Sequence, residues 1–210
     1  MPTPCKATLA LFCAMSAMSA HARPFAEVDC THAAEPISEN KLTFKNSKER
    51  LKALSYTATV YSYGKDGRQE EQIAQVPRIA LKMGDDWLAG SNRGEWGGEL
   101  MLIDAKGNAQ KIISDNIRDM YPTEFGIVVV AGLSHMMSNR GKVYLITKNG
   151  ASLDTKVLFG LDGAPKDSWT TAEGKIFITT SYGTSIIKKD FTLQRVLCKG
   201  HQYSDYRQGL

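Results

Sequence analysis

Two short stretches carry the side chains best suited to bind a ligand. The first reads Ser91-Asn92-Arg93-Gly94-Glu95-Trp96-Gly97-Gly98, and the second reads Leu133-Ser134-His135-Met136-Met137-Ser138-Asn139-Arg140-Gly141. Each contains Asn-Arg-Gly, whose guanidinium can bind a carboxylate or a phosphate, and the tryptophan can anchor a partner. We therefore expect a ligand-binding surface formed by Asn92, Arg93, Glu95, Trp96, His135, Asn139 and Arg140.

The same Asn-Arg-Gly sequences also suit tight turns. Asn and Gly adopt positive φ readily, and Arg93 can pair with Glu95 or Glu99 inside its own loop. Met136 and Met137 have a similar double interpretation, because methionine either lines an adaptable contact surface or fills a gap under a loop. The sequence supports both the turn and the ligand site.

The two stretches occupy equivalent places in a repeat. Gly98 begins a strand-and-turn segment that ends at Gly107, and Gly141 begins a similar one, 43 residues later, that ends at Gly150. A third segment begins near Gly174. A period in the forties with several short strands per unit is typical of β-propeller blades.

Each unit is expected to contain four strands, with loops between the second and third strands on one face. The predicted strands run over 78–82, 86–91, 99–104 and 109–113, then over 117–121, 126–131, 142–147 and 155–159, and finally from about 167, over 174–180, 184–188 and 193–198. The apolar run Ile127–Val130 indicates a strand buried on both faces. We expect Trp87, Tyr144, Trp169 and Phe177 in the core.

The segment before these units has a different pattern. Residues 46–54 predict a short surface helix, with Asn46 or Ser47 at its N-terminus and Leu51 and Leu54 on one face. Residues 56–63 and 69–76 alternate as a hairpin around Asp66-Gly67, and could form the outer part of a fourth blade. Residues 23–45 have little pattern. The fold class we expect is all-β: a small β-propeller-like fold of about four short-stranded blades. The alternative is a β-sandwich or meander in which the repetition is coincidental.

The N-terminus predicts export. Residues 1–22 read as a secretory signal peptide with Lys6, an apolar run and an Ala20-His21-Ala22 cleavage site, whereas the alternative, a membrane anchor, would need a longer run. We expect one domain over 23–200, a flexible tail over 201–210, no membrane span and a periplasmic or secreted location.

Export also bears on the cysteines. Once the signal is removed, Cys30 and Cys198 remain, and in an oxidising compartment they are expected to form a disulfide that joins the two ends of the domain. Such a bond would remove on the order of 4 to 5 kcal/mol of unfolded-state freedom. The alternative is two separate thiols.

The charge and the short motifs argue against nucleic-acid binding and against the common catalytic and metal sites. The chain has 26 basic and 22 acidic side chains, a net charge of +4, and its bases are scattered, so we do not expect nucleic-acid binding. Past residue 22 the histidines are His32, His135 and His201, in no zinc-type spacing, and the chain lacks Cys-x-x-Cys, P-loop and Gly-x-Ser-x-Gly motifs. We expect no metal and no cofactor.

The segments at 98–107 and 141–150 resemble those of secreted bacterial β-propeller repeat proteins, including the NHL, YVTN and gluconolactonase-like groups. The stretch Asn92–Leu100 also resembles one in a group of uncharacterised exported proteobacterial proteins. The lactonase resemblance implies an alternative function, a metal-dependent hydrolase in which Glu95, Asp119, Asn139 and Asp167 would converge on a metal.

The sequence favours a binding protein over an enzyme. We expect an exported envelope module that engages a protein or a glycan through loops on one face, for example as an inhibitor or immunity-type protein. A monomer is expected, with a homo-oligomer, paired through an exposed strand edge, as the alternative. The sequence does not identify the partner.

Overall fold

The protein is described by a computed structural model that covers residues 25–30, 39–150 and 152–203, with the side chain of Tyr63 left out. The predicted signal peptide, residues 1–22, lies outside the described residues. No helix in the described part of the chain combines the length and the apolar character needed to cross a membrane.

Three antiparallel meanders of four strands form the body of the fold. The first sheet has the order β2-β5-β6-β7-β8, the second β12-β11-β10-β9, and the third β1-β16-β15-β14-β13. Their bounds are β2 Lys41–Thr43, β5 Ile79–Met83, β6 Asp86–Gly90, β7 Leu100–Ile103 and β8 Ala109–Ile113; β9 Ile117–Thr123, β10 Gly126–His135, β11 Ser138–Asn149 and β12 Ser152–Leu161; β1 Ala26–Val28, β13 Asp167–Thr170, β14 Ile176–Thr179, β15 Thr184–Ile187 and β16 Leu193–Cys198.

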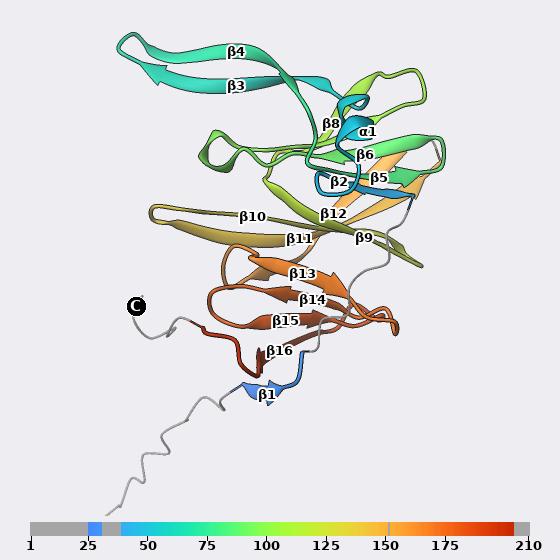
Figure 1. Ribbon diagram of the computed structural model, residues 1–210, viewed down its shortest axis with the longest axis vertical. Coiled ribbons are helices and arrows are strands. Elements are labelled where there is room, and N and C mark those ends of the chain that lie inside the picture. The colour runs from blue at the N-terminus through green and yellow to red at the C-terminus, as the bar shows by residue number, and fades with distance from the viewer. Residues whose placement is uncertain (1–24, 31–38, 151, 204–210) are drawn as a thin grey trace, which may run out of the picture.

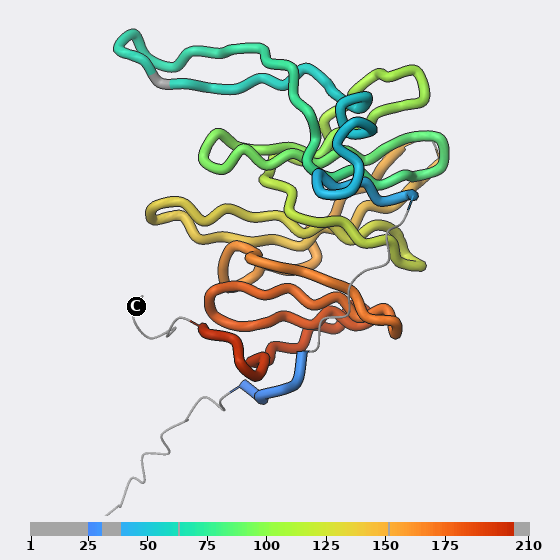
Figure 2. Tube along the Cα trace, viewed as in Figure 1, coloured from blue at the N-terminus to red at the C-terminus, as the bar shows by residue number. Residues whose placement is uncertain are grey.

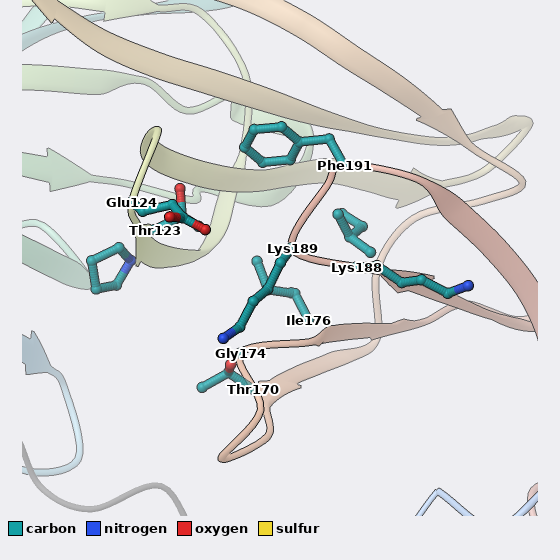
Figure 3. Close-up of a pocket in the computed structure, with 10 residues that line it drawn as sticks. Thr123, Glu124, Thr170, Gly174, Ile176, Lys188, Lys189 and Phe191 are labelled. Atoms are coloured by element: carbon teal, nitrogen blue, oxygen red, sulfur yellow. The ribbon is translucent and has the colours of Figure 1, made fainter.

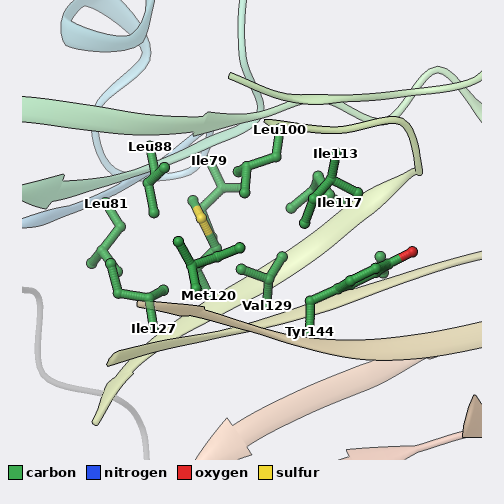
Figure 4. Close-up of a cluster of buried hydrophobic side chains, with 12 residues drawn as sticks. Ile79, Leu81, Leu88, Leu100, Ile113, Ile117, Met120, Ile127, Val129 and Tyr144 are labelled. Atoms are coloured by element: carbon green, nitrogen blue, oxygen red, sulfur yellow. The ribbon is translucent and has the colours of Figure 1, made fainter. Parts of the chain in front are cut away.

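The three sheets lie one above another in chain order (Figure 1). The second sheet lies between two cores, because alternate side chains of β10 point into different ones. Val129 and Ala131 pack with Leu88 and Leu100 of the first sheet, as Figure 4 shows for this cluster. Val128 and Val130 pack with Ile176 and Ile178 of the third sheet. Ile127 is 8% exposed and Val128–Val130 are fully buried, which confirms the prediction made from the apolar run.

Segments outside the meanders cover the two outer faces of the stack. Leu51 of the helix α1 (Lys48–Lys52) and Tyr56 pack on the outer face of the first sheet. The disulfide and Tyr203 pack on the outer face of the third sheet, near Trp169 and Phe177. Both end sheets are therefore shielded from water.

The strands predicted for the three units are confirmed, with bounds that differ by a few residues. Tyr144, Trp169 and Phe177 are buried as expected, and Trp87 is half-buried. The strands β1 and β2 were not predicted, because each has three residues in a segment without periodicity and is held by pairing with β16 and β5. A short edge strand that is held by backbone hydrogen bonds to an existing sheet needs no alternation of apolar and polar residues.

The predicted helix and hairpin are also present, with two differences. Ser47 occupies the N-cap of α1 without a side-chain capping bond, and Asn46 Oδ1 accepts instead from Thr43 N at 2.8 Å. The strands β3 (Tyr56–Gly64) and β4 (Gly67–Gln75) form a separate two-stranded sheet that extends away from the stack (Figure 2). In the described residues the hairpin belongs to no four-stranded unit.

The described residues thus show an all-β fold of three stacked four-stranded units, without a closed ring or a fourth unit. The ends are joined by the Cys30–Cys198 disulfide, whose Cα atoms lie 5.3 Å apart. His201–Tyr203, which we expected to belong to a flexible tail, lie next to the third sheet, since Tyr203 Oη accepts from Cys198 N at 3.0 Å. The rest of the predicted tail is outside the described residues.

Removing the disulfide should destabilise the fold strongly. The bond spans a sequence separation of 168 residues, so its loss should lower the free energy of unfolding by on the order of 4 kcal/mol and the melting temperature by about 10 °C. The comparison is between the oxidised protein and Cys30→Ser/Cys198→Ser in thermal melts. Reductant should lower the melting temperature of the wild type and leave the double variant unchanged; equal melts would contradict the assigned role.

Candidate functional site

The first predicted stretch is a tightly structured loop between β6 and β7. Gly94–Trp96 form the short 3-10 helix η1, and Asn92 Oδ1 accepts from Gly94 N at 3.0 Å. Gly94 and Gly97 have φ of 65° and 85°, a region where residues with a Cβ are strained. Arg93 N donates to Gly97 O at 2.8 Å and closes the loop on itself. The turn interpretation therefore describes Asn92 and Gly94 well.

Arg93 turns inward and forms a buried ion pair with Glu99. Its Nη1 and Nη2 donate to Glu99 Oε1 and Oε2 at 2.5 and 2.6 Å, and both side chains are largely buried. Ser91 Oγ and Tyr56 Oη also donate to Glu99 Oε1, at 2.5 and 2.6 Å. We name Tyr56, Ser91, Arg93 and Glu99 the buried network. It ties the hairpin and the loop to the first sheet, and it confirms the alternative in which Arg93 pairs with Glu99 inside the protein.

The buried network keeps Glu99 ionised. Burial alone would raise the pKa of the Glu99 carboxyl, but hydrogen bonds from Arg93, Ser91 and Tyr56 outweigh it and hold the pKa below the ordinary value of 4.5. The pKa of Tyr56 is raised, first by burial and then by its bond to Glu99, so its hydroxyl remains a donor. The site is built as a structural ion pair with charge-assisted bonds.

The arginine of the second Asn-Arg-Gly stretch also lies near a buried carboxylate, but at a longer distance and with more of its side chain exposed. Arg140 Nη1 lies 3.8 Å from Oδ2 of the buried Asp115, and half of the Arg140 side chain is exposed. Tyr144 Oη donates to the same carboxylate oxygen at 3.1 Å. Burial and the Asp115 charge raise the pKa of Tyr144 to about 12. Arg140 therefore remains accessible to a ligand at the surface, whereas Arg93 does not.

Hydrogen bonds and an ion pair connect neighbouring loops into one continuous face. His135 Nε2 and Glu95 Oε2 lie 2.6 Å apart and join β10 to η1. Asn116 Nδ2 donates to Gly94 O at 2.9 Å. Asn139 Nδ2 donates to Tyr182 Oη in the β14–β15 loop at 3.3 Å, and its Oδ1 accepts from Ala164 N at 2.7 Å. The β6–β7, β10–β11 and β14–β15 loops lie on the same side of the stack (Figure 2). We call this side the loop face.

Large apolar side chains are exposed on the loop face. Trp96 is 56% exposed, and Met136 and Met137, at the tip of the β10–β11 hairpin, are 92% and 101% exposed. Met136 has a φ of 47°, so the turn holds it in an uncommon backbone conformation. Of the two interpretations of this methionine pair, the structure supports an exposed contact surface, because neither side chain fills a gap beneath the loop.

The acidic set suggested by the lactonase resemblance does not converge. Asp119 on β9 is engaged by Lys41 and Tyr121, at 2.8 and 2.7 Å. Asp167 Oδ1 accepts from Ser168 N on β13, while Glu95 lies with His135 on the loop face. Among the described residues, no three His, Cys, Asp or Glu side chains are grouped as metal ligands would be. The set is thus spread over separate parts of the stack.

Several residues of the site were missed by the sequence analysis. Tyr56, Asn116, Tyr144 and Tyr182 reach the loops from strands or loops far away in the chain. Tertiary packing brings them there, by the hairpin lying on the first sheet for Tyr56 and by the stacking of the units for the others, so no local pattern could have identified them. Asp115 could have been found from the sequence. It lies just before the predicted strand at 117–121, and a carboxylate there can pair with Arg140.

Comparison with known proteins adds no relative: no family model, no curated protein and no solved structure matches this chain. The function must therefore be argued from the arrangement of the residues.

Replacing Glu99 should destabilise the protein and change its pH dependence. Glu99→Gln leaves Arg93 buried without a counter-charge, which should cost about 3 kcal/mol at pH 7. Because the folded pKa of Glu99 is below 4.5, its contribution is present above that pH and is lost as the pH falls through the folded value. Urea unfolding from pH 7 to pH 3 should show a smaller loss of stability on acidification for the variant.

The control for this experiment is Glu70→Gln, at an exposed position on β4 with a single 3.7 Å ion pair to Arg68. It should change the unfolding free energy by less than about 0.5 kcal/mol. If Glu99→Gln behaved like Glu70→Gln, the buried network would have no structural role.

Proposed function

We propose that this protein is a binding module that works outside the cytoplasm and engages a protein partner through the loop face. The observation that carries the proposal is the exposure of Trp96, Met136 and Met137 above loops that are fixed from below by the buried network and by the Glu95–His135 contact. A disulfide between the ends of the domain supports an oxidising environment.

Rigid loops favour binding, because an ordered surface loses little conformational entropy when a partner docks. Exposed Met136 and Met137 can adapt to the shape of an apolar partner surface, and Trp96 can enter a pocket in it. The half-exposed Arg140 and the Glu95–His135 pair provide polar groups nearby. A protein partner is favoured over a glycan, because the two most exposed side chains, Met136 and Met137, offer a sugar no hydrogen-bond donor, although Trp96 offers a flat aromatic face.

The scaffold that we propose for this module is propeller-like. The support is the arrangement of the first strands of the units, which contact each other along one edge as the inner strands of blades do. The strand β5 of the first unit contacts β9 of the second, and Tyr121 Oη on β9 donates to Ser168 Oγ on β13 at 2.9 Å.

The proposal predicts that the tip of β10–β11 touches the partner. A photo-crosslinking amino acid placed at Met137 should give a defined adduct with an envelope protein in the cells that produce this chain. Adding Met136→Asp, which places a charge in the apolar contact, should reduce the yield of that adduct at least about tenfold without lowering the melting temperature.

The matched control is Val157→Asp, which introduces the same charge at a half-exposed position on β12. It should leave the adduct at Met137 unchanged. The proposal would be contradicted if Met136→Asp left the yield of the Met137 adduct unchanged. It would also be contradicted if Met136→Asp and Val157→Asp lowered that yield equally.

A further inference from the structure

A cavity of about 320 Å³ lies where the first and second sheets meet, apart from the exposed apolar side chains of the loop face. Its walls come from β2 and the residues after it, from the start of β5, and from the start of β9. The residues that matter for its chemistry are Lys41, Lys45, Arg78, Arg118, Asp119 and Asn92.

The stacking of the sheets places two arginines at this cavity. Ile79 and Ile117 are buried in the core between the sheets, whereas the side chains of their neighbours Arg78 and Arg118 are exposed and line the cavity. Gly90 permits the close approach, since a Cβ there would lie 2.6 Å from Ile117 Cγ2. Ile117 N also donates to Ser91 O at 2.9 Å and fixes the two sheets in register.

The charges at the cavity are not balanced. Asp119 is its single acidic residue, and it is already engaged, because Lys41 Nζ lies 2.8 Å from Oδ1 and Tyr121 Oη donates to Oδ2. Within the described ranges, Lys45, Arg78 and Arg118 form no ion pair. Partial burial and the neighbouring Arg78 charge lower the pKa of Arg118, and both arginines keep exposed side chains at the mouth of the cavity.

We propose that this cavity binds a small ligand through a carboxylate or phosphate group held between Arg78 and Arg118. Guanidinium groups donate in pairs to the oxygens of such anions, and Lys45 adds a third positive charge. Asn92 and Thr43 offer polar contacts beside the anionic group. The cavity is larger than a single phosphate, so the remainder of the ligand would lie along Phe44, which is half-exposed.

A second cavity of similar size shows what distinguishes this one. It lies between the second and third sheets and has two lysines, Lys188 and Lys189, in its wall, but Glu124 lines it as well (Figure 3). Lys189 also lowers the pKa of the exposed Glu173, after larger effects from the hydrogen bonds of that carboxyl. Acidic groups thus accompany its bases, whereas Arg78 and Arg118 have none of their own.

Isothermal titration calorimetry of the full mature protein at low salt tests the proposal with three probes: inorganic phosphate, glucose 6-phosphate and glucuronate. At least one should bind, and Arg78→Gln or Arg118→Gln should weaken it at least about tenfold, the loss expected for one charge-assisted contact. A preference for glucose 6-phosphate would assign a phosphorylated ligand, and a preference for glucuronate an acidic one.

Arg68→Gln is the matched control, because Arg68 is an exposed arginine on β4, remote from the cavity in sequence and in sheet. It should bind the probes as the wild type does. A second readout is thermal melting: the probe should raise the melting temperature of the wild type and should no longer raise that of Arg118→Gln. Absence of binding by all three probes, or equal weakening by Arg68→Gln, would overturn the proposal.

Discussion

The second sheet contributes side chains to a hydrophobic core on each of its faces, and this dictates where the other two sheets lie. The side chains of β10 alternate between two cores, so the sheet cannot be stable without a neighbour on each side. This requirement stacks three four-stranded units, and the terminal segments then close the outer faces of the first and third. Residues that are far apart in the chain are thereby brought to common edges.

The positions of the loops follow from this stacking. Sheets that are packed core to core present equivalent loops side by side, and short polar contacts then join them: Asn116 to Gly94, His135 to Glu95, and Asn139 to Tyr182. Below them, the Arg93–Glu99 pair anchors the β6–β7 loop to the first sheet. The apolar tip residues are therefore carried on ordered backbone. The same register between sheets brings Arg78 and Arg118 together at the other candidate site.

Much of the strand order could be predicted from the sequence, because the local patterns agree with the fold. Asp66-Gly67 indicated a hairpin, and Ile127–Val130 indicated a strand covered on both sides. The use of Arg93 could not be decided, since a guanidinium suits a ligand and an internal carboxylate equally well. Tyr56 and Ser91 also donate to Glu99 and hold its carboxylate in position for Arg93. Tyr56 lies 43 residues before Glu99 in the chain. The short strands β1 and β2 lacked any pattern of their own.

The central claim is that the loop face is an ordered surface, and amide hydrogen exchange of the free protein tests it most directly. Glu99 N, Ser91 N and Arg93 N donate to Ser91 Oγ, Glu99 O and Gly97 O, at 3.1, 2.9 and 2.8 Å. If the loop face is ordered, these three amides exchange as slowly as those of Val128–Val130, and Met137 at the exposed tip exchanges fast. Exchange of the three loop amides as fast as that of Met137 would show a mobile loop and contradict the claim.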